Sequence, residues 1–499
     1  MTFLLGSGAG FSGDRTDAAI PVVAELIRRG QPAALLFETL GERTLAAAHR
    51  ARHDDPDAGF EPLLDELLEP VLDHCLINGI AILGNFGAAN PAGACERVKA
   101  LAERAGRADI RIGHVQGDDI RSRLSRIDLQ RWEGESGEMP GEEALISANV
   151  YLGAAPLVEA LAQGAEVVVT GRVADPALFL APLMHHFGWA WDDWDRLAAG
   201  TMAGHLAECG SQVSGGYFAD PGLKDVPDLA TVGYPIIEVE EDGSLLVTKP
   251  PGTGGCVTER TVKEQLLYEV HDPSGYLTPD VVVDLSDARV VQIGPDRVAV
   301  SGIRGRPAPE RLKTTVCYAG GWQGEAEISY AGPNAFGRAR LAAEVLRVRL
   351  TFRAPPELRS RFDIIGHASV FDSDTGDLQR HTVGQENGDY RLRLAVGHAE
   401  RRWVERATQE LLALYCAGPA GGGGVRRQFQ RRICTASYLV KRSDVEAFGL
   451  LCRHVFHRMH CSVDRSVQDA LVQGSHEGPC FPQIADKAIV DTIAAGFDF

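Results

Sequence analysis

The 499-residue sequence has no apolar run long enough to span a membrane and no lysine- or arginine-rich run long enough to follow a nucleic-acid backbone. Its nearest approach to a basic run is two arginine doublets at 426–427 and 431–432, and the formal net charge is −18. A glycine-rich loop occupies the N-terminal stretch where a signal peptide would have its apolar core. We therefore expect a cytoplasmic protein that binds neither nucleic acid nor membrane.

Several chemical signatures are missing as well. None of the ten cysteines forms a C-x-x-C pair, and many, such as Cys75, Cys317 and Cys416, lie in apolar stretches, so reduced and mostly buried thiols are expected. The nucleophile elbow G-x-S-x-G is absent, which argues against a Ser-His-Asp hydrolase. The remaining composition, 44% hydrophobic and 24% charged, is that of a globular protein with two or three domains.

A glycine-rich segment at 6–15 joins a short apolar run to an expected helix over 17–29. Glycine at a strand-to-helix turn permits positive φ and a close approach of a ligand to the backbone, and the helix N-terminus offers unpaired N–H groups. Gly8, Gly10 and Gly13 also match G-x-G-x-x-G, which suggests nicotinamide or flavin binding. Against this, Asp14 places a carboxylate where a pyrophosphate would lie. An ordinary turn remains the alternative.

The same strand-loop-helix unit recurs along the first half of the chain. Apolar runs end at Leu5, Phe37, Leu83, Val115 and Val169, and each is followed by a loop with glycine or polar residues. Strands that alternate with helices indicate a parallel sheet, whose strand ends meet at one edge. We therefore expect the five loops to share a crevice. Amphipathic patterns predict helices over 62–78 and 149–161.

The pattern changes near residue 230, where short β-rich runs replace long helices. The sequence thus predicts an α/β fold in which an N-terminal parallel-sheet strand-loop-helix domain over 1–228 is followed by a second, α+β domain over 229–445. A C-terminal helical tail is expected over 446–499. Strands are expected over 344–352 and 362–371, and a helix over 404–415.

Seven motifs together resemble the acyclic terpene utilisation (AtuA-like) family. They are GSGAGFSGDR at 6–15, FETLGERT at 37–44, GNFGAANP at 84–91, TGRVADP at 170–176, GTGGCVT at 252–258, EQLLYE at 264–269 and GPAGGGGV at 418–425. The resemblance implies a link to the catabolism of branched terpenoid acids, whose intermediates are CoA thioesters. The tail after residue 445 does not resemble the ferredoxin-like domain of longer members, which leaves open whether a separate partner subunit is needed.

Acid/base chemistry on a thioester needs a positioned carboxylate or histidine and donors for an enolate-like oxygen. The crevice offers acids at the strand ends and arginines that can bind a carboxylate or phosphate through two N–H groups. The alternative is that Asp14 and Asp175 only cap helices. The candidate catalytic residues are Asp14, Glu38, His205 and Glu208. The candidate substrate-binding residues are Gly8, Gly10, Gly13, Arg15, Arg43, Asn85, Asn90, Asp118, Arg172, Asp175, Gly254 and Gly255.

Two further clusters carry ionisable side chains. In the segment 204–210, His205 and Glu208 lie at positions i and i+3 and therefore share one face of a helix, where they can act as a base and the acid that orients it. Cys209 follows directly. The alternative is a buried histidine with a structural role and an unreactive thiol. The tail holds Cys452, His454, His457, His460 and Cys461, which are metal-ligand residue types without a standard zinc spacing. We expect neither a metal nor another cofactor.

The sequence therefore predicts an enzyme, a lyase (hydratase or dehydratase) or isomerase that acts on an acyl-CoA thioester or related carboxylate. A non-catalytic subunit that binds an acyl-CoA or a partner enzyme is the alternative, and a nicotinamide-dependent oxidoreductase comes third. We expect a small-molecule substrate and a homo-oligomer.

Overall fold

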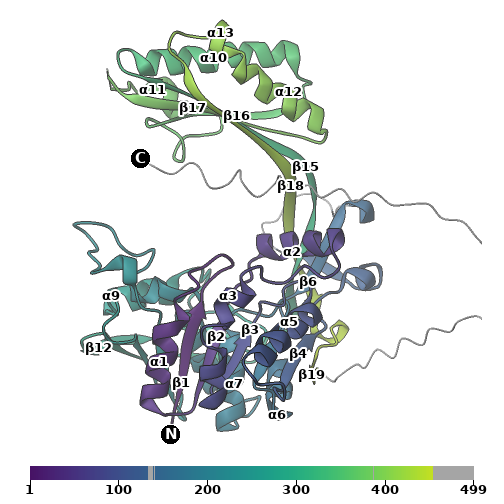
Figure 1. Cartoon of the computed structure of the whole chain (residues 1–499), viewed down its shortest axis with the longest axis vertical. Helices are drawn as coiled ribbons and strands as arrows, with labels where there is room; N and C mark the ends of the chain where they lie inside the picture. Colours follow the sequence, from purple (N-terminus) through teal and green to yellow (C-terminus); the bar gives the residue numbers. More distant parts are fainter. Residues whose placement is uncertain (133–138, 140, 386, 453–499) are drawn as a thin grey trace, which may run out of the picture. The chain divides into compact units, whose positions relative to one another are not determined.

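The computed structural model describes residues 1–132, 139, 141–385 and 387–452, and Met1–Cys452 forms one compact unit (Figure 1). The tail candidates His454, His457, His460 and Cys461 lie outside the described residues. No helix in the described ranges is both long and apolar enough to cross a bilayer.

Five parallel strands form the centre of a ten-stranded sheet. They are arranged in the order β1 (Thr2–Ala9), β2 (Ala33–Phe37), β3 (Ala81–Gly84), β7 (Val167–Val169) and β4 (Ile112–Gln116). Their carboxyl ends therefore meet at one edge of the sheet, as the sequence predicts. The α/β class and the parallel sheet are confirmed.

Both faces of this sheet are buried, because alternate side chains of each strand enter different hydrophobic cores. Leu4 and Leu35 face helices α1 (Ala19–Arg29) and α5 (Pro91–Arg104), whereas Leu5 and Leu36 face α6 (Ala155–Ala162), α7 (Ala177–Phe187) and α8 (Trp194–Glu208). This explains why the strands consist of continuous apolar runs.

Antiparallel strands extend the sheet on both sides. β8 (Ile236–Glu240) pairs with β1 and is followed by β9 (Leu245–Thr248), β13 (Arg297–Ser301) and β12 (Arg289–Gly294), while β19 (Phe448–Leu451) pairs with β4. The predicted boundary between 228 and 229 and the start of the predicted tail at 446 thus both fall within one sheet. The strands that begin near residue 230 thus extend the first sheet.

A second sheet has the order β16 (Arg359–Ile365), β17 (Asp389–His398), β15 (Arg311–Ala331), β18 (Gly423–Lys441) and β5 (Leu129–Arg131), and β6 (Leu145–Val150) also pairs with β15. The long strands β15 and β18 enter two cores. Val316 packs in the core of the first sheet, whereas Ile328 packs with helices α10 (Ala335–Arg353) and α12 (Arg401–Leu412). A bulge between Ala319 and Trp322 separates these halves. Gly321 lies in this bulge at φ +83°, which glycine tolerates.

Three sequence predictions of local structure are wrong. Residues 344–352 belong to helix α10, because Ala339, Ala342, Ala343, Leu346 and Leu350 recur at helical spacing and fill a core. The expected helix over 62–78 is two helices, α3 (Leu64–Leu68) and α4 (Leu72–Ile77), on either side of Pro70. The expected helix over 149–161 begins only at Ala155, because the preceding residues form β6.

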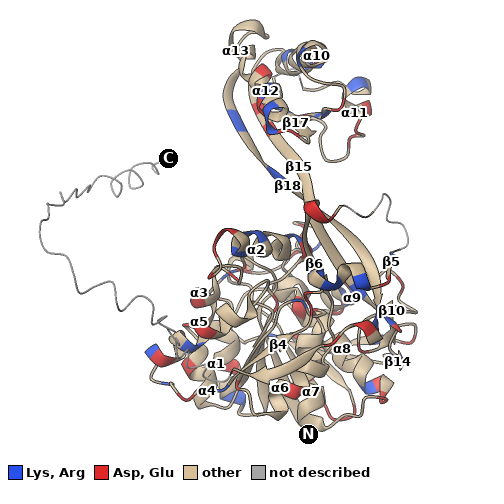
Figure 2. Cartoon of the chain, turned by 90° about the vertical axis from the view of Figure 1, so that its right-hand side faces the viewer, with Lys and Arg blue, Asp and Glu red and all other residues tan. Residues whose placement is uncertain are grey.

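The remaining helices and strands complete the fold. They are α2 (Glu42–Asp54), α9 (Glu259–Leu267), β10 (Tyr276–Leu277), β11 (Val282–Asp284), β14 (Arg304–Arg306), α11 (Asp377–His381) and α13 (Leu414–Ala417). Figure 2 shows acidic and basic residues interspersed over these elements. The arginine doublets at 426–427 and 431–432 lie on β18, where Arg426 is the register partner of Glu327 on β15. They therefore belong to a mixed-charge strand pair and not to a basic helix or loop.

Candidate active site

The carboxyl ends of the parallel strands bring together a group of polar side chains that we call the strand-end cluster. Its members are Glu38, Glu42, Asn85, Asp118, Tyr151, Arg172 and Asp175. Glu38, Asn85, Asp118 and Arg172 are almost completely buried, although five of the seven members are acids or bases. Burial of so much polar surface is costly unless each group finds partners.

Glu38 and Asn85 connect the loops after β2 and β3. The Asn85 side-chain amide donates to Glu38 Oε1 at 2.7 Å, and the Leu40 backbone N–H donates to the same oxygen at 2.9 Å. Asn85 Oδ1 in turn accepts the Thr39 backbone N–H at 2.7 Å. Both side chains are therefore fixed by the backbone that follows the strands.

Asp118 connects β4 with β7. Its Oδ2 accepts the Arg172 backbone N–H and the Asn149 amide, both at 2.9 Å. Asn149 Oδ1 lies 3.0 Å from His49 Nε2 on α2. Asp118, Asn149 and His49 contribute to the lining of a cavity of about 210 Å³ at the ends of β3 and β4. This volume is below the ~300–1,000 Å³ of drug-sized ligand pockets, so it suits the head of a ligand and not a whole CoA.

Arg172 is the centre of the cluster, and its side chain is only 1% exposed. The guanidinium donates to the Val173 carbonyl at 2.8 Å and also to the Leu40 carbonyl and the Asp175 carboxylate. It lies 4.5 Å from the centroid of the Tyr151 ring. One buried cation thus links the loops after β2 and β7.

Glu42 and Tyr151 form the side of the cluster nearest β15. Lys313 on β15 donates to Glu42 Oε1 at 3.0 Å and lies 4.6 Å from the Tyr151 ring centroid, and the Tyr151 hydroxyl donates to the same carboxylate oxygen. Although burial raises the pKa of Glu42, Lys313 and Tyr151 lower it to about 2. Glu42 is therefore a fixed negative charge and an unsuitable proton carrier.

His205 and Glu208 form the pair that their spacing predicts, with His205 Nδ1 3.0 Å from Glu208 Oε1. Both residues are buried in α8. Among the described residues, neither His205 Nε2 nor Glu208 Oε2 has a hydrogen-bond partner. Buried polar atoms of this kind are rare in folded proteins and are available to a ligand or a proton.

Three carboxyl groups of the cluster, those of Glu38, Asp175 and Asp118, have raised pKa values and keep their protons to higher pH than free acids do. Burial raises the pKa of Glu38, and Arg172 opposes this increase. Removal from bulk water also raises the pKa of Asp175 well above its usual range, with Arg172 again opposing and the charges of Glu38 and Glu208 adding to the increase. The Asp175 side chain is nonetheless 35% exposed, so its carboxyl stands at the open side of the cluster.

Asp118 gives a testable pH dependence. Burial raises its pKa from 3.8 to about 6, so the folded protein keeps a proton that the unfolded chain loses. Its contribution to the free energy of unfolding is therefore complete below about pH 4 and falls by about 3 kcal/mol as the pH rises through 6. Asp118→Asn keeps an oxygen for both donors, and we expect it to flatten this dependence in denaturant titrations between about pH 4 and 7. Asp119→Asn, at the exposed neighbouring residue, serves as control. If the stability of Asp118→Asn depended on pH as that of the wild type does, the raised pKa of Asp118 would be contradicted.

The glycine-rich loop is held by its own aspartate. Asp14 accepts the backbone N–H groups of Gly10 and Arg15 at 2.7 Å and the Tyr234 hydroxyl at 2.5 Å. A pyrophosphate would have to displace this carboxylate from those N–H groups. Arg15 donates to the Val232 carbonyl at 3.2 Å and to Asp17.

The glycines of this loop serve close packing. A Cβ on Gly10 would lie 2.5 Å from the backbone of Cys209, at the end of α8, and one on Gly8 would lie 2.6 Å from the Phe37 ring. Gly13 has φ +90°. The loop that carries Asp14 thus packs against the helix that carries His205 and Glu208.

Four predicted site residues lie elsewhere. Asn90 caps α5 through the Gly93 N–H at 3.1 Å and donates to the Ala58 carbonyl, which is a structural role. Arg43 lies exposed on α2. Gly254 packs against the backbone of Asp228, and Gly255, at φ +83°, packs against that of Ser214.

Sequence reasoning missed several members of the site. Asn149 and Tyr151 lie in a segment for which the sequence predicts a helix, whereas Asn149 belongs to strand β6 and Tyr151 follows it. Lys313 comes from a strand far along the chain with no motif around it. His49 and Tyr234 likewise have no local signal. Only the pairing of β6 with β15 brings Tyr151 and Lys313 together.

Comparison with known protein families gives one match. The family model described as "Acyclic terpene utilisation family protein AtuA" matches residues 3–448, from β1 to the first residue of β19. No curated protein and no solved structure gives a match. The family resemblance found in the sequence is confirmed.

Proposed function

The chain belongs to the acyclic terpene utilisation family AtuA. We propose that it is an enzyme that adds protons to, or removes them from, the acyl chain of a CoA thioester or related carboxylate formed when acyclic terpenes are used. The proposed reaction is a hydration, a dehydration or an isomerisation. The family match supports the metabolic setting, and the strand-end cluster supports the reaction class.

The observation that carries the proposal is the arrangement of Glu38 and Asp175 around the buried Arg172 guanidinium. A carboxyl group with a raised pKa keeps its proton to higher pH and can act as an acid as well as a base. The guanidinium favours negative charge on a nearby substrate oxygen, as forms when a proton leaves the carbon beside a thioester carbonyl.

Each residue has a distinct role in this proposal. Glu38 exchanges the substrate proton, and Asp175 contacts the ligand at the open side of the cluster. His205 is oriented by Glu208 through Nδ1 and offers Nε2 as a second acid or base. Asn85 and Arg172 hold the two carboxyl groups in place.

The test is proton exchange with solvent. The purified protein, incubated in D₂O with α,β-unsaturated branched acyl-CoA thioesters, is expected to incorporate deuterium into the acyl chain and to form a hydrated or isomerised product, both detected by mass spectrometry. Incorporation only after a partner protein is added would support the non-catalytic subunit instead. Turnover that requires a nicotinamide would support the oxidoreductase, and no incorporation in any mixture would contradict the proposal.

A further inference from the structure

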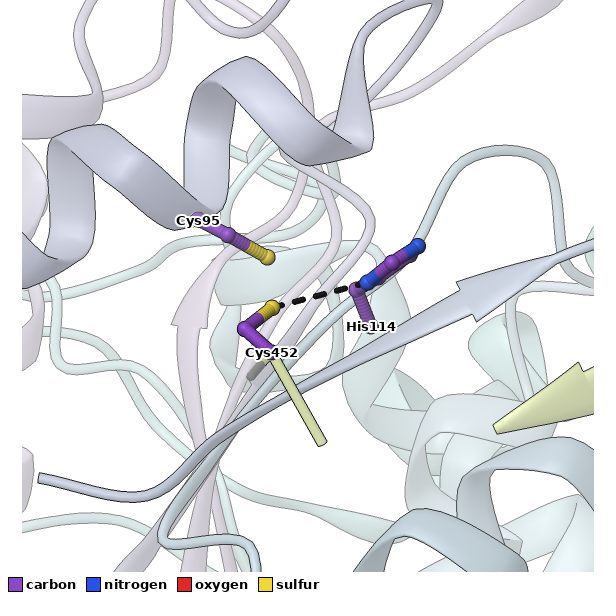
Figure 3. Close-up of side chains that lie close together, drawn as sticks. All are labelled: Cys95, His114 and Cys452. Carbon is purple, nitrogen blue, oxygen red and sulfur yellow. Dashed lines mark hydrogen bonds between the residues drawn. The ribbon is translucent and has the colours of Figure 1, made fainter. Parts of the chain in front are cut away.

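Three side chains with metal-ligand atoms lie together outside the strand-end cluster. Figure 3 shows Cys95 on helix α5, His114 on strand β4 and Cys452 directly after β19, with their sulfur and nitrogen atoms turned toward one another. The Cys95 Sγ, a His114 ring nitrogen and the Cys452 Sγ all lie within 4.8 Å of one another. We call these residues the Cys-His-Cys triad.

The backbone fixes each member. Cys95 is buried in the first two turns of α5, which is capped by Asn90. The Cys452 N–H donates to the Ile112 carbonyl at 2.8 Å and thereby continues the ladder between β19 and β4. His114 lies in the middle of β4. Three separate elements thus converge on one point.

The separation of Cys452 and His114 fits two ligands of one tetrahedral ion. Zinc binds thiolate at about 2.3 Å and imidazole at about 2.0–2.1 Å, so two such ligands on one tetrahedral ion lie about 3.6 Å apart. The Cys452 Sγ lies 3.5 Å from His114 Nδ1. The donor set of two sulfurs and one imidazole nitrogen is also one that soft divalent ions prefer.

We propose that Cys95, His114 and Cys452 form a binding site for a soft divalent metal ion of the zinc type. The sequence analysis considers a metal only for the tail cluster and predicts none. This triad has no motif spacing, since Cys452 and His114 are 338 positions apart in the chain. The metal would join β19 to β4 and α5.

The protonation states agree with this geometry. The hydrogen bond from Cys95, supported by one with His114, lowers the pKa of Cys452 to about 5. The pKa of Cys95 is raised by the same hydrogen bond and by burial, so this thiol releases its proton to solvent when the ion binds.

His114 also has an outer partner. Gln116 on β4 hydrogen-bonds His114 Nε2 through its side-chain amide. If Nδ1 binds the ion, Nε2 carries the proton of the ring. The Gln116 side chain can accept a hydrogen bond from this N–H when its amide is turned so that the oxygen faces the ring. Such outer contacts commonly orient metal-binding histidines.

The test is metal content and the cobalt spectrum of the full chain. The protein, purified under reducing conditions with zinc in the growth medium, is expected to hold about one ion per chain by elemental analysis. Replacement by Co²⁺ is expected to give thiolate-to-cobalt charge-transfer bands and intense tetrahedral bands in the visible region. Cys95→Ser and His114→Ala should each weaken binding by at least about tenfold. The matched control is Cys434→Ser, which replaces a half-buried cysteine on β18 and should leave metal binding unchanged.

Chelation gives a second readout. Removing the ion should lower the Tm of the wild type and speed amide exchange in Phe448–Leu451, but it should change neither in Cys95→Ser. Metal retained in both Cys95→Ser and His114→Ala would place it elsewhere and overturn the proposal. A wild-type protein that takes up neither ion, or that holds a Cys95–Cys452 disulfide after reduction, would overturn it as well.

Discussion

Glu38→Gln is expected to lower kcat/KM for the acyl-CoA substrate by about 10²–10⁴-fold while leaving the fold intact, because the side chain loses its proton and keeps its shape. Glutamine still offers an oxygen to the Asn85 amide and the Leu40 N–H, so the hydrogen bonds that position residue 38 persist. Deuterium incorporation from D₂O should fall in parallel with product formation. The measurement is steady-state kinetics, with circular dichroism and thermal unfolding to verify the fold.

A matched control is Glu25→Gln. Glu25 is also a buried glutamate, but it pairs with Arg28 and Arg29 on α1, away from the strand ends. The same chemical change there should leave kcat/KM near that of the wild type. If Glu38→Gln were as active as Glu25→Gln, Glu38 would have no part in proton transfer.

The second large effect is expected on stability. Arg172→Met should lower the free energy of unfolding by about 3–5 kcal/mol, because it removes a buried cation from among carboxylates. The Leu40 and Val173 carbonyls would also lose their donor. Denaturant titration measures the change.

Arg28→Met is the control for this change, because the Arg28 side chain is 66% exposed and Glu25 keeps Arg29 as a second partner. We expect an effect of at most about 1 kcal/mol there. A similarly small loss in Arg172→Met would mean that the bonds of the guanidinium to Asp175 and to the backbone carbonyls contribute little to stability. The central role given to this guanidinium would then be incorrect.

The strand ends were predictable from the sequence because a parallel sheet imposes a simple rule. Each apolar run such as 33–37 is buried on both faces, and the residue after it reaches the same edge as its neighbours. Glu38, Asn85, Asp118 and Arg172 were found in this way. The pair of His205 and Glu208 followed from helical spacing alone.

The sequence could not predict what depends on distant pairing. Tyr151 meets Lys313 only because β6 pairs with β15. Residues 344–352 show local alternation typical of a strand, but the wider spacing of small and apolar residues in Ala335–Arg353 fits a helix that fills a core. The Cys-His-Cys triad has no motif spacing, since its members come from α5, β4 and the end of β19.

The position of β19 has a consequence for synthesis of the chain. Strand β4 is complete once residue 116 has been translated, but its outer edge receives its partner only when Phe448–Leu451 emerge. During this interval the nascent chain exposes a row of unpaired backbone groups, which invite pairing with other chains. Closing such a long loop is also slow, because its entropy must be overcome before any contact forms. The outer edge of β4 is therefore covered only after Phe448–Leu451 have been made, and ribosome stalling just before Phe448 would leave this edge open to aggregation.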